Sequence, residues 1–278
     1  MKKINRRSFL AAAGLTAAAL ALPACGGSAS STASSTASSA ASSEAASTSA
    51  AAELTTVEAG KLTMATNAAF PPYEMTTDAG EFEGIDIDTA KAIAEKLGLE
   101  LQIDDMDFDA ALLSVQQGKA DIVMAGVTVT DERKAVMDFS DSYATGIQSI
   151  IVPEGSDITS PDDLAGKKIG TQRGTTGYIY CSDDFGDDAV VAYDDGLTAV
   201  QALNNGQVDA VVIDNAPAKE FVAANPGLVI LDTSYAEEDY AIGLAKGSAL
   251  EDAVNAALEE LKADGTLQSI VDKYITAE

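Results

Sequence analysis

The chain has 278 residues and a formal net charge of −27, from 44 acidic and 17 basic residues, and it contains no histidine. The lack of histidine excludes a Ser-His-Asp triad and a His-ligated metal, and the negative charge argues against binding to nucleic acid. Cys25 and Cys181 are the only cysteines. We therefore expect no cysteine metal cluster, no bound metal and no cofactor, and we expect Cys181 to be a small buried residue.

Residues 1–25 have the pattern of an export signal, with four cations between positions 2 and 7 followed by a short apolar core. The apolar run is shorter than the roughly 20 residues that a membrane-spanning helix needs, so an uncleaved anchor is the less favoured alternative. Leu22–Cys25 resembles a bacterial lipobox, in which Cys25 becomes the lipid-bearing first residue of the mature protein. Asn5–Leu10 resembles a twin-arginine signal. Sec and twin-arginine export therefore both stay open.

Residues 26–55 are almost entirely Ser, Ala and Thr, with nothing to bury. This composition predicts a flexible tether, which would span about 30 Å as a coil.

From residue 56 onward, short apolar strands alternate with amphipathic helices, which predicts an α/β fold with largely parallel sheets. Gly98 and Gly118 each stop a helix, and Ser160 with Pro161 begins one. The predicted strands are 62–66, 99–103, 121–124, 147–152, 168–171 and 208–214. The predicted helices are 85–97, 108–118, 131 onward, 161 onward, 195–205, 216–224, 249–263 and 266–275.

An internal repeat indicates how this part divides. Leu112–Met124 and Val200–Val212 have matching patterns, in which a helix ends at Gly118 or Gly206 and an Asp three residues later opens a Val-rich strand. Two lobes of like design fit this repeat better than one sheet does. In open parallel sheets, ligands bind beyond the carboxyl ends of the strands.

Arg133 is the most informative single residue. It follows a strand and lies in the first turn of a helix that Thr130 can cap, where the helix dipole disfavours a cation by up to about 1 kcal/mol. An anion shared with the free N–H groups around Gly126–Thr130 would justify its position. An ion pair with a surface acid such as Asp131 is an equally open alternative.

The loops at the strand ends together offer one cation, one acid, three hydroxyls and two aromatic rings: Arg133, Asp214, Thr128, Thr175, Thr176, Phe70 and Phe108. A zwitterionic α-amino acid needs these groups, because its carboxylate binds the cation, its ammonium binds the acid and its side chain packs on apolar faces. Two plainer alternatives remain at this point. Asp214 can be a helix N-cap, and Phe108 can be an ordinary core residue.

Five motifs add a family resemblance. They are Phe70–Glu74, Gly84–Ala94 (with Thr89 where an aliphatic residue is usual), Asp107–Ala110, Thr128–Arg133 and Ala263–Leu267. Over about residues 58–276 the chain resembles the family 3 solute-binding proteins of amino-acid ABC transporters. The resemblance implies a two-lobed periplasmic-binding-protein fold of type II, with two hinge strands crossing between the lobes. We expect 56–146 plus 240–278 to form lobe 1 and 147–239 to form lobe 2.

The resemblance also implies roles for individual residues. Phe70 and Phe108 match aromatic walls, Thr176 matches a closing contact, and Asp214 matches the ammonium partner. The carboxylate binders are matched by Gly126, Thr128 and Arg133. With the neighbouring strand-end positions, the predicted ligand-binding set is Asn67, Phe70, Phe108, Ala125, Gly126, Thr128, Arg133, Thr175, Thr176 and Asp214.

We therefore predict an extracytoplasmic, monomeric receptor, anchored through lipid on Cys25, that captures an amino acid by lobe closure and delivers it to a permease. No G-x-x-x-x-G-K-[ST] loop occurs, so the ATPase must be a separate partner. The predicted ligand is polar and neutral, because the family's basic-residue binders tend to carry an acid where Asn67 stands. Gln172 and Ile213 replace the Lys and His usual in glutamine binders, and Arg173 is a candidate for favouring an acidic side chain. The alternatives are a cleft enzyme of the cyclohexadienyl dehydratase type and a lipoprotein that signals or adheres.

Overall fold

The computed structural model describes residues 54–275. The expected signal at 1–25, the lipidation site at Cys25 and almost all of the expected tether lie outside the described residues, so these stay predictions.

The first of two main sheets has the strand order β5-β1-β6-β14-β7. Strand β14 runs opposite to its neighbours β6 and β7, and the other four strands share one direction. These strands are β1 (Lys61–Thr66), β5 (Glu100–Asp105), β6 (Ile122–Val123), β7 (Met137–Phe139) and β14 (Gly243–Ala245). The helices of this part are α1 (Ile85–Leu97), α2 (Phe108–Gln116), α3 (Asp131–Val136), α7 (Glu251–Ala263) and α8 (Thr266–Tyr274). A small sheet beside it contains β2 (Ala69–Phe70), β3 (Glu74–Thr76) and β4 (Phe82–Glu83).

The second main sheet has the order β10-β9-β11-β8-β12, and here β8 is the one reversed strand along that path. Its strands are β8 (Ala144–Pro153), β9 (Ile169–Gln172), β10 (Val190–Tyr193), β11 (Ala210–Asp214) and β12 (Leu228–Ile230). Its helices are α4 (Thr176–Phe185), α5 (Gly196–Asn204) and α6 (Asn215–Ala224), with short 3-10 turns at Pro161–Leu164 and Asp187–Ala189.

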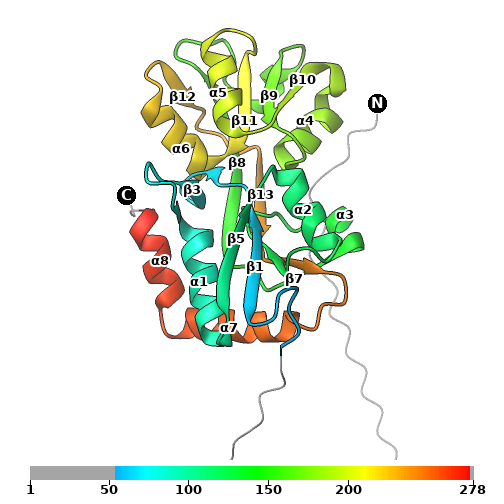
Figure 1. Ribbon diagram of the computed structural model, residues 1–278. Coiled ribbons are helices and arrows are strands. Elements are labelled where there is room, and N and C mark those ends of the chain that lie inside the picture. The colour runs from blue at the N-terminus through cyan, green and yellow to red at the C-terminus, as the bar shows by residue number, and fades with distance from the viewer. Residues whose placement is uncertain (1–53, 276–278) are drawn as a thin grey trace, which may run out of the picture. The chain divides into compact units, whose positions relative to one another are not determined.

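A two-stranded antiparallel ribbon connects the two sheets. Strand β13 (Ala236–Tyr240) pairs with the first half of β8, from Ala144 to Gln148, before β8 enters the second sheet. In Figure 1, β8 and β13 run from the part that contains β1, β5 and β7 to the part that contains β9 and β11. The predicted fold class, with two α/β lobes and two crossing strands, is confirmed. The residue boundaries given above for the lobes stay predictions.

The two copies of the internal repeat have the same glycine conformation and the same type of aspartate hydrogen bond in the structure. Gly118 and Gly206 follow α2 and α5 with φ of 65° and 66°, the left-handed region that glycine enters most easily. Asp121 accepts a bond from the Thr63 N–H at 2.8 Å, and Asp209 accepts one from the Lys168 N–H at 2.7 Å. Each carboxylate thereby ties the loop after a helix to the neighbouring parallel strand.

Most of the predicted elements are confirmed, with differences at their ends. Thr130 caps α3 by accepting a bond from the Arg133 N–H at 3.1 Å, as expected. The predicted strand 121–124 shortens to Ile122–Val123, and the helix expected from Pro161 is a single 3-10 turn. Helix α4 and strands β7, β10, β12, β13 and β14 were not predicted.

Cys181 is fully buried, and burial raises the pKa of its thiol to about 12, so it behaves as a small core residue as predicted. Within residues 54–275, no helix is both long and apolar enough to span a bilayer.

Candidate functional site

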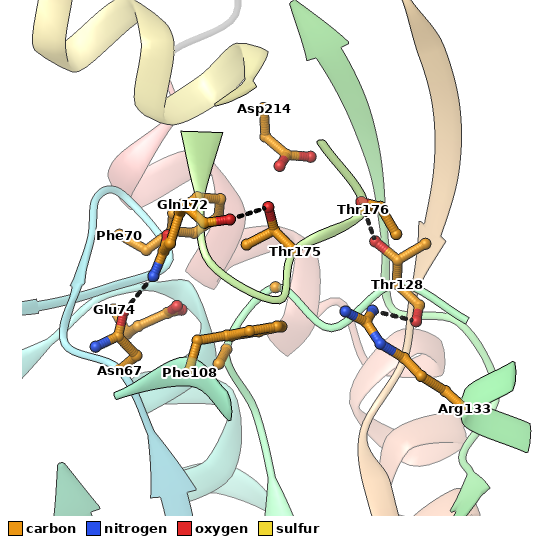
Figure 2. Close-up of a pocket in the computed structure, with 12 residues that line it drawn as sticks. Asn67, Phe70, Glu74, Phe108, Thr128, Arg133, Gln172, Thr175, Thr176 and Asp214 are labelled. Carbon is orange, nitrogen blue, oxygen red and sulfur yellow. Dashed lines mark hydrogen bonds between the residues drawn. The ribbon is translucent and has the colours of Figure 1, made fainter. Parts of the chain in front are cut away.

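A narrow cavity lies where the two sheets face each other, and all ten residues of the predicted ligand-binding set line it. The cavity also includes Glu74 and Gln172, which were not in that set. In the view of Figure 2, Arg133 lies toward one side, Asn67 and Glu74 toward the other, and Phe108 between them.

The strand order explains why these residues meet. Asn67 follows β1, Gly126 follows β6, Thr175 follows β9, and Asp214 is the last residue of β11. These four strands point their carboxyl ends toward the space between the sheets, which is where open α/β sheets bind ligands.

Arg133 is buried, with 8 % of its surface exposed, and among residues 54–275 its guanidinium bonds only to backbone carbonyls. Its Nη1 donates to the Thr128 oxygen at 2.8 Å, and its Nη2 donates to the Gly174 oxygen at 3.2 Å. The guanidinium carbon lies 5.3 Å from the centre of the Phe108 ring. Burial lowers the pKa of Arg133. No carboxylate within the described chain forms an ion pair with it, so the alternative of a surface pair with Asp131 is wrong.

Asp214 has the position of a helix N-cap, but its side chain does not cap α6. Instead, the Tyr240 hydroxyl donates to its Oδ1, and Gln148 Nε2 donates to its Oδ2 at 2.8 Å. Burial raises the pKa of Asp214 to about 7, although these two bonds oppose the rise. The cap alternative is therefore right about the position and wrong about the bonding.

The aromatic walls also serve the core. Phe108 packs with Ala111 and Val123 in a buried cluster while it lines the cavity, so the two alternatives for this residue both hold. A Cβ on Gly126 would lie 2.9 Å from the Phe70 ring, and Gly126 has a φ of 55°. Glycine at position 126 therefore brings the backbone close to the cavity wall.

Polar groups occupy the side of the cavity away from Arg133. Asn67 Nδ2 donates to the Met106 oxygen at 3.0 Å, and Asn67 Oδ1 accepts from Gln172 Nε2 at 2.8 Å. Glu74 is fully buried, and its carboxyl group shares a hydrogen bond with the carboxyl group of Asp86. Burial, with the charge of nearby Asp86, raises the pKa of Glu74 well above its usual range, which favours its protonated form.

Several bonds join the lobes across the cavity, which shows that the cleft is closed. The Gln172–Asn67 and Arg133–Gly174 bonds each connect residues of the two sheets, and the Thr128 and Thr176 hydroxyls are 3.5 Å apart. Arg173, in contrast, does not line the cavity. Its side chain is about half exposed, and its Nη2 lies 3.6 Å from Asp194 Oδ1.

Sequence reasoning missed Glu74 although it quoted the motif that contains it, because an isolated acid gives no sign of being buried. It also missed Gln148 and Glu238, two buried polar residues of the hinge ribbon that bond to cavity residues. In the described part of the chain, no group of acidic or sulphur ligands is arranged to hold a metal ion.

Comparison with known proteins gives a consistent family assignment. Residues 62–277 match the family of bacterial extracellular solute-binding proteins, family 3. A probable histidine-binding protein of Neisseria gonorrhoeae is 32 % identical and covers 99 % of this chain and 98 % of its own. An ABC transporter glutamine-binding protein of Bacillus subtilis is 35 % identical over 71 % of this chain and 74 % of its own. A solved structure of an ancestral arginine-binding protein bound to glutamine has a TM-score of 0.75 and 42 % identity, covering 79 % of this chain and all of that one.

The raised pKa of Asp214 predicts how the stability of the ligand-free protein depends on pH. The unfolded chain loses this proton near pH 4 and the folded chain near pH 7, so the folded state becomes less stable as the pH rises between these values. Asp214→Asn should therefore raise the free energy of unfolding at pH 8 by more than about 1 kcal/mol and should flatten its pH dependence.

Urea unfolding at pH 5, 6, 7 and 8 measures this effect. Asp239→Asn is the matched control, because it removes an exposed acid of the hinge ribbon and relieves the same general charge repulsion. Equal pH profiles for the two variants would contradict the raised pKa of Asp214.

Proposed function

The chain belongs to the bacterial extracellular solute-binding proteins of family 3, and from this we propose that it is the amino-acid receptor of an ABC importer. The observation that carries the proposal is a pair of opposite charges in one closed cavity. Arg133 has no carboxylate partner and Asp214 has no cationic partner within the described chain. A zwitterionic amino acid supplies both missing partners, with its carboxylate on Arg133 and its ammonium on Asp214.

Capture proceeds by lobe closure. A ligand held by groups of both sheets contacts more of them in the closed state than in the open state, so binding favours closure. A membrane permease would then recognise the closed form, and a separate ATPase would drive transport. The protein itself performs no chemistry on its ligand in this proposal.

The ligand's side chain is expected to be polar and neutral. The cavity wall away from Arg133 carries two amides, Asn67 and Gln172, and the carboxyl group of Glu74, whose pKa is raised by burial. Asn67 Nδ2 carries two hydrogens and gives one to Met106, so one remains for a ligand oxygen. An amide side chain such as that of glutamine both accepts and donates bonds, which suits this mixture of groups.

Glu74 also favours a second candidate, a basic amino acid. The buried carboxyl group of Glu74 has no cationic partner in the described chain, so a ligand cation can pair with its ionised form and offset the cost of burying that charge. Binding of a basic side chain would therefore release the Glu74 proton. An acidic side chain has no cation to meet here, because Arg173 lies outside the cavity.

A thermal-shift panel of the free amino acids tests the function. At a concentration near 1,000 times the dissociation constant, the true ligand should stabilise the protein by about 4 kcal/mol, which raises Tm by roughly 8–16 °C for a domain of this size. We expect glutamine or another neutral polar amino acid to give the largest shift. The absence of a shift with every amino acid would refute the receptor function.

Glu74→Gln separates the two ligand classes. With a neutral ligand the variant should change affinity by less than about tenfold, whereas a basic ligand should bind at least about 30-fold more weakly, or 2 kcal/mol. Calorimetry in two buffers of different ionisation enthalpy measures directly how many protons are released when the ligand binds. A basic ligand releases a proton from the wild type and not from the variant.

Arg133→Ala should weaken binding by roughly 30- to 5,000-fold, because losing one member of a buried charge-assisted pair costs about 2–5 kcal/mol. Arg173→Ala is the matched control, since it removes an exposed arginine from the neighbouring loop. Calorimetry on both variants measures the difference. A loss of less than about threefold for Arg133→Ala would mean that the guanidinium does not hold the ligand.

We propose in addition that the receptor is held at the outer face of the cell membrane by lipid on Cys25. Cys25→Ser should release the protein from the membrane fraction, because that lipid would be its only anchor. Immunoblotting of membrane and soluble fractions measures the release. A variant that stays with the membrane would contradict lipid anchoring at this residue.

A further inference from the structure

Glu238 is a buried carboxylate that the proposed ligand contacts do not involve. Along β13 exposed and buried side chains alternate, so Glu238 and Tyr240 face inward while Glu237 faces solvent. Glu238 does not line the cavity, but it bonds to two hydroxyls that do, those of Thr128 and Thr176. The carboxylate therefore lies behind the cavity wall.

One oxygen of this carboxylate connects three separate parts of the fold. Its Oε2 accepts bonds from Thr128 Oγ1 at 3.2 Å, from Thr176 Oγ1 at 2.9 Å and from Gln148 Nε2 at 3.0 Å. Thr128 follows β6 of the first sheet, Thr176 begins α4 beside the second sheet, and Gln148 lies in the hinge ribbon. Opening the cleft separates Thr128 from Thr176, so at least one of these bonds must break.

We propose that Glu238 is a positioning residue that latches the closed state of the receptor from the hinge. The proposal rests on the amino-acid receptor function given above and adds a residue that controls how long the ligand stays bound. The carboxyl oxygen accepts three hydrogen bonds from separate parts of the fold, so the latch contributes to closure without touching the ligand.

The latch also determines which donors remain for the ligand. A threonine hydroxyl has one hydrogen, and Thr128 and Thr176 each give theirs to Glu238. The ligand's carboxylate is therefore held by Arg133 and by backbone N–H groups. In the empty cleft, the negative charge of Glu238 is the strongest acidic influence on Arg133, so it also offsets part of that buried charge.

Glu238→Gln tests the latch, because the amide keeps the shape of the side chain and removes its charge. Stopped-flow kinetics with L-glutamine, or with L-arginine if the panel selects it, should show dissociation about tenfold faster and an association rate within about twofold of the wild type. That change equals about 1.4 kcal/mol in affinity. Only dissociation changes because the latch exists only after closure.

Glu237→Gln is the matched control, since it removes the same charge from the exposed face of the same strand. Equal dissociation rates for the two variants would overturn the latch. A lower Tm of ligand-free Glu238→Gln without faster dissociation would also overturn it, because that result describes a purely structural role.

Thr176→Val removes the hydroxyl that donates to Glu238 Oε2, and this variant tests the latch if Glu238→Gln does not fold. It should also speed dissociation, and in the double variant the two effects should be less than additive, because they break the same bond. Full additivity would overturn the latch. If the wild type binds no amino acid, the receptor function fails, and this result is distinct from a wild type that binds while the variants release normally.

Discussion

Closure of the cleft removes the Arg133 guanidinium from water while no carboxylate of the described chain contacts it. Removing one charge from water without a bonded counter-charge costs several kcal/mol, and the two carbonyl bonds of Arg133 return only part of that. A ligand carboxylate restores the missing partner. Cleft closure and ligand binding are therefore thermodynamically coupled, because the closed state reaches its full stability only when the cavity contains an anion.

The hinge ribbon takes part in the same event, because its inward side chains contact cavity residues directly. Tyr240 donates to Asp214 across the ribbon, and no side chain fits between them. A Cβ on Gly146 would lie 2.5 Å from the Tyr240 ring and 2.7 Å from the Asp214 carboxylate. Gly174, with a φ of 72°, gives the same close approach where the Asp109 carboxylate meets the opposite loop. The closed cleft thus depends on two positions that have no side chain.

Local chemistry made much of this site predictable from the sequence. A strand that ends in small or hydroxyl residues and leads into a capped helix places its next residues at the carboxyl edge of a sheet, so ten cavity residues could be named from their loops. Two of the unpredicted elements, β13 and α4, lack such a local pattern. Strand β13 reads as Ala-Glu-Glu-Asp-Tyr, which is polar, and it becomes a strand because β8 offers it a partner. Helix α4 buries little more than Cys181 and two small residues at its start, too few for an apolar period.

Two of the residues that the sequence could not reveal are acids, and the reason is physical. With 44 acidic residues in the chain, any single Asp or Glu is expected to be solvated. Glu74 and Glu238 are buried because residues distant in the chain close over them, and burial of that kind leaves no trace in the neighbouring sequence. The two buried acids differ in the hydrogen-bond partners of their carboxyl groups. Glu238 accepts bonds from three donors on one oxygen, whereas Glu74 bonds to the carboxyl group of Asp86 and has a pKa raised by burial. The same residue type therefore supplies a hydrogen-bond acceptor at the hinge and an ionisable wall in the cavity.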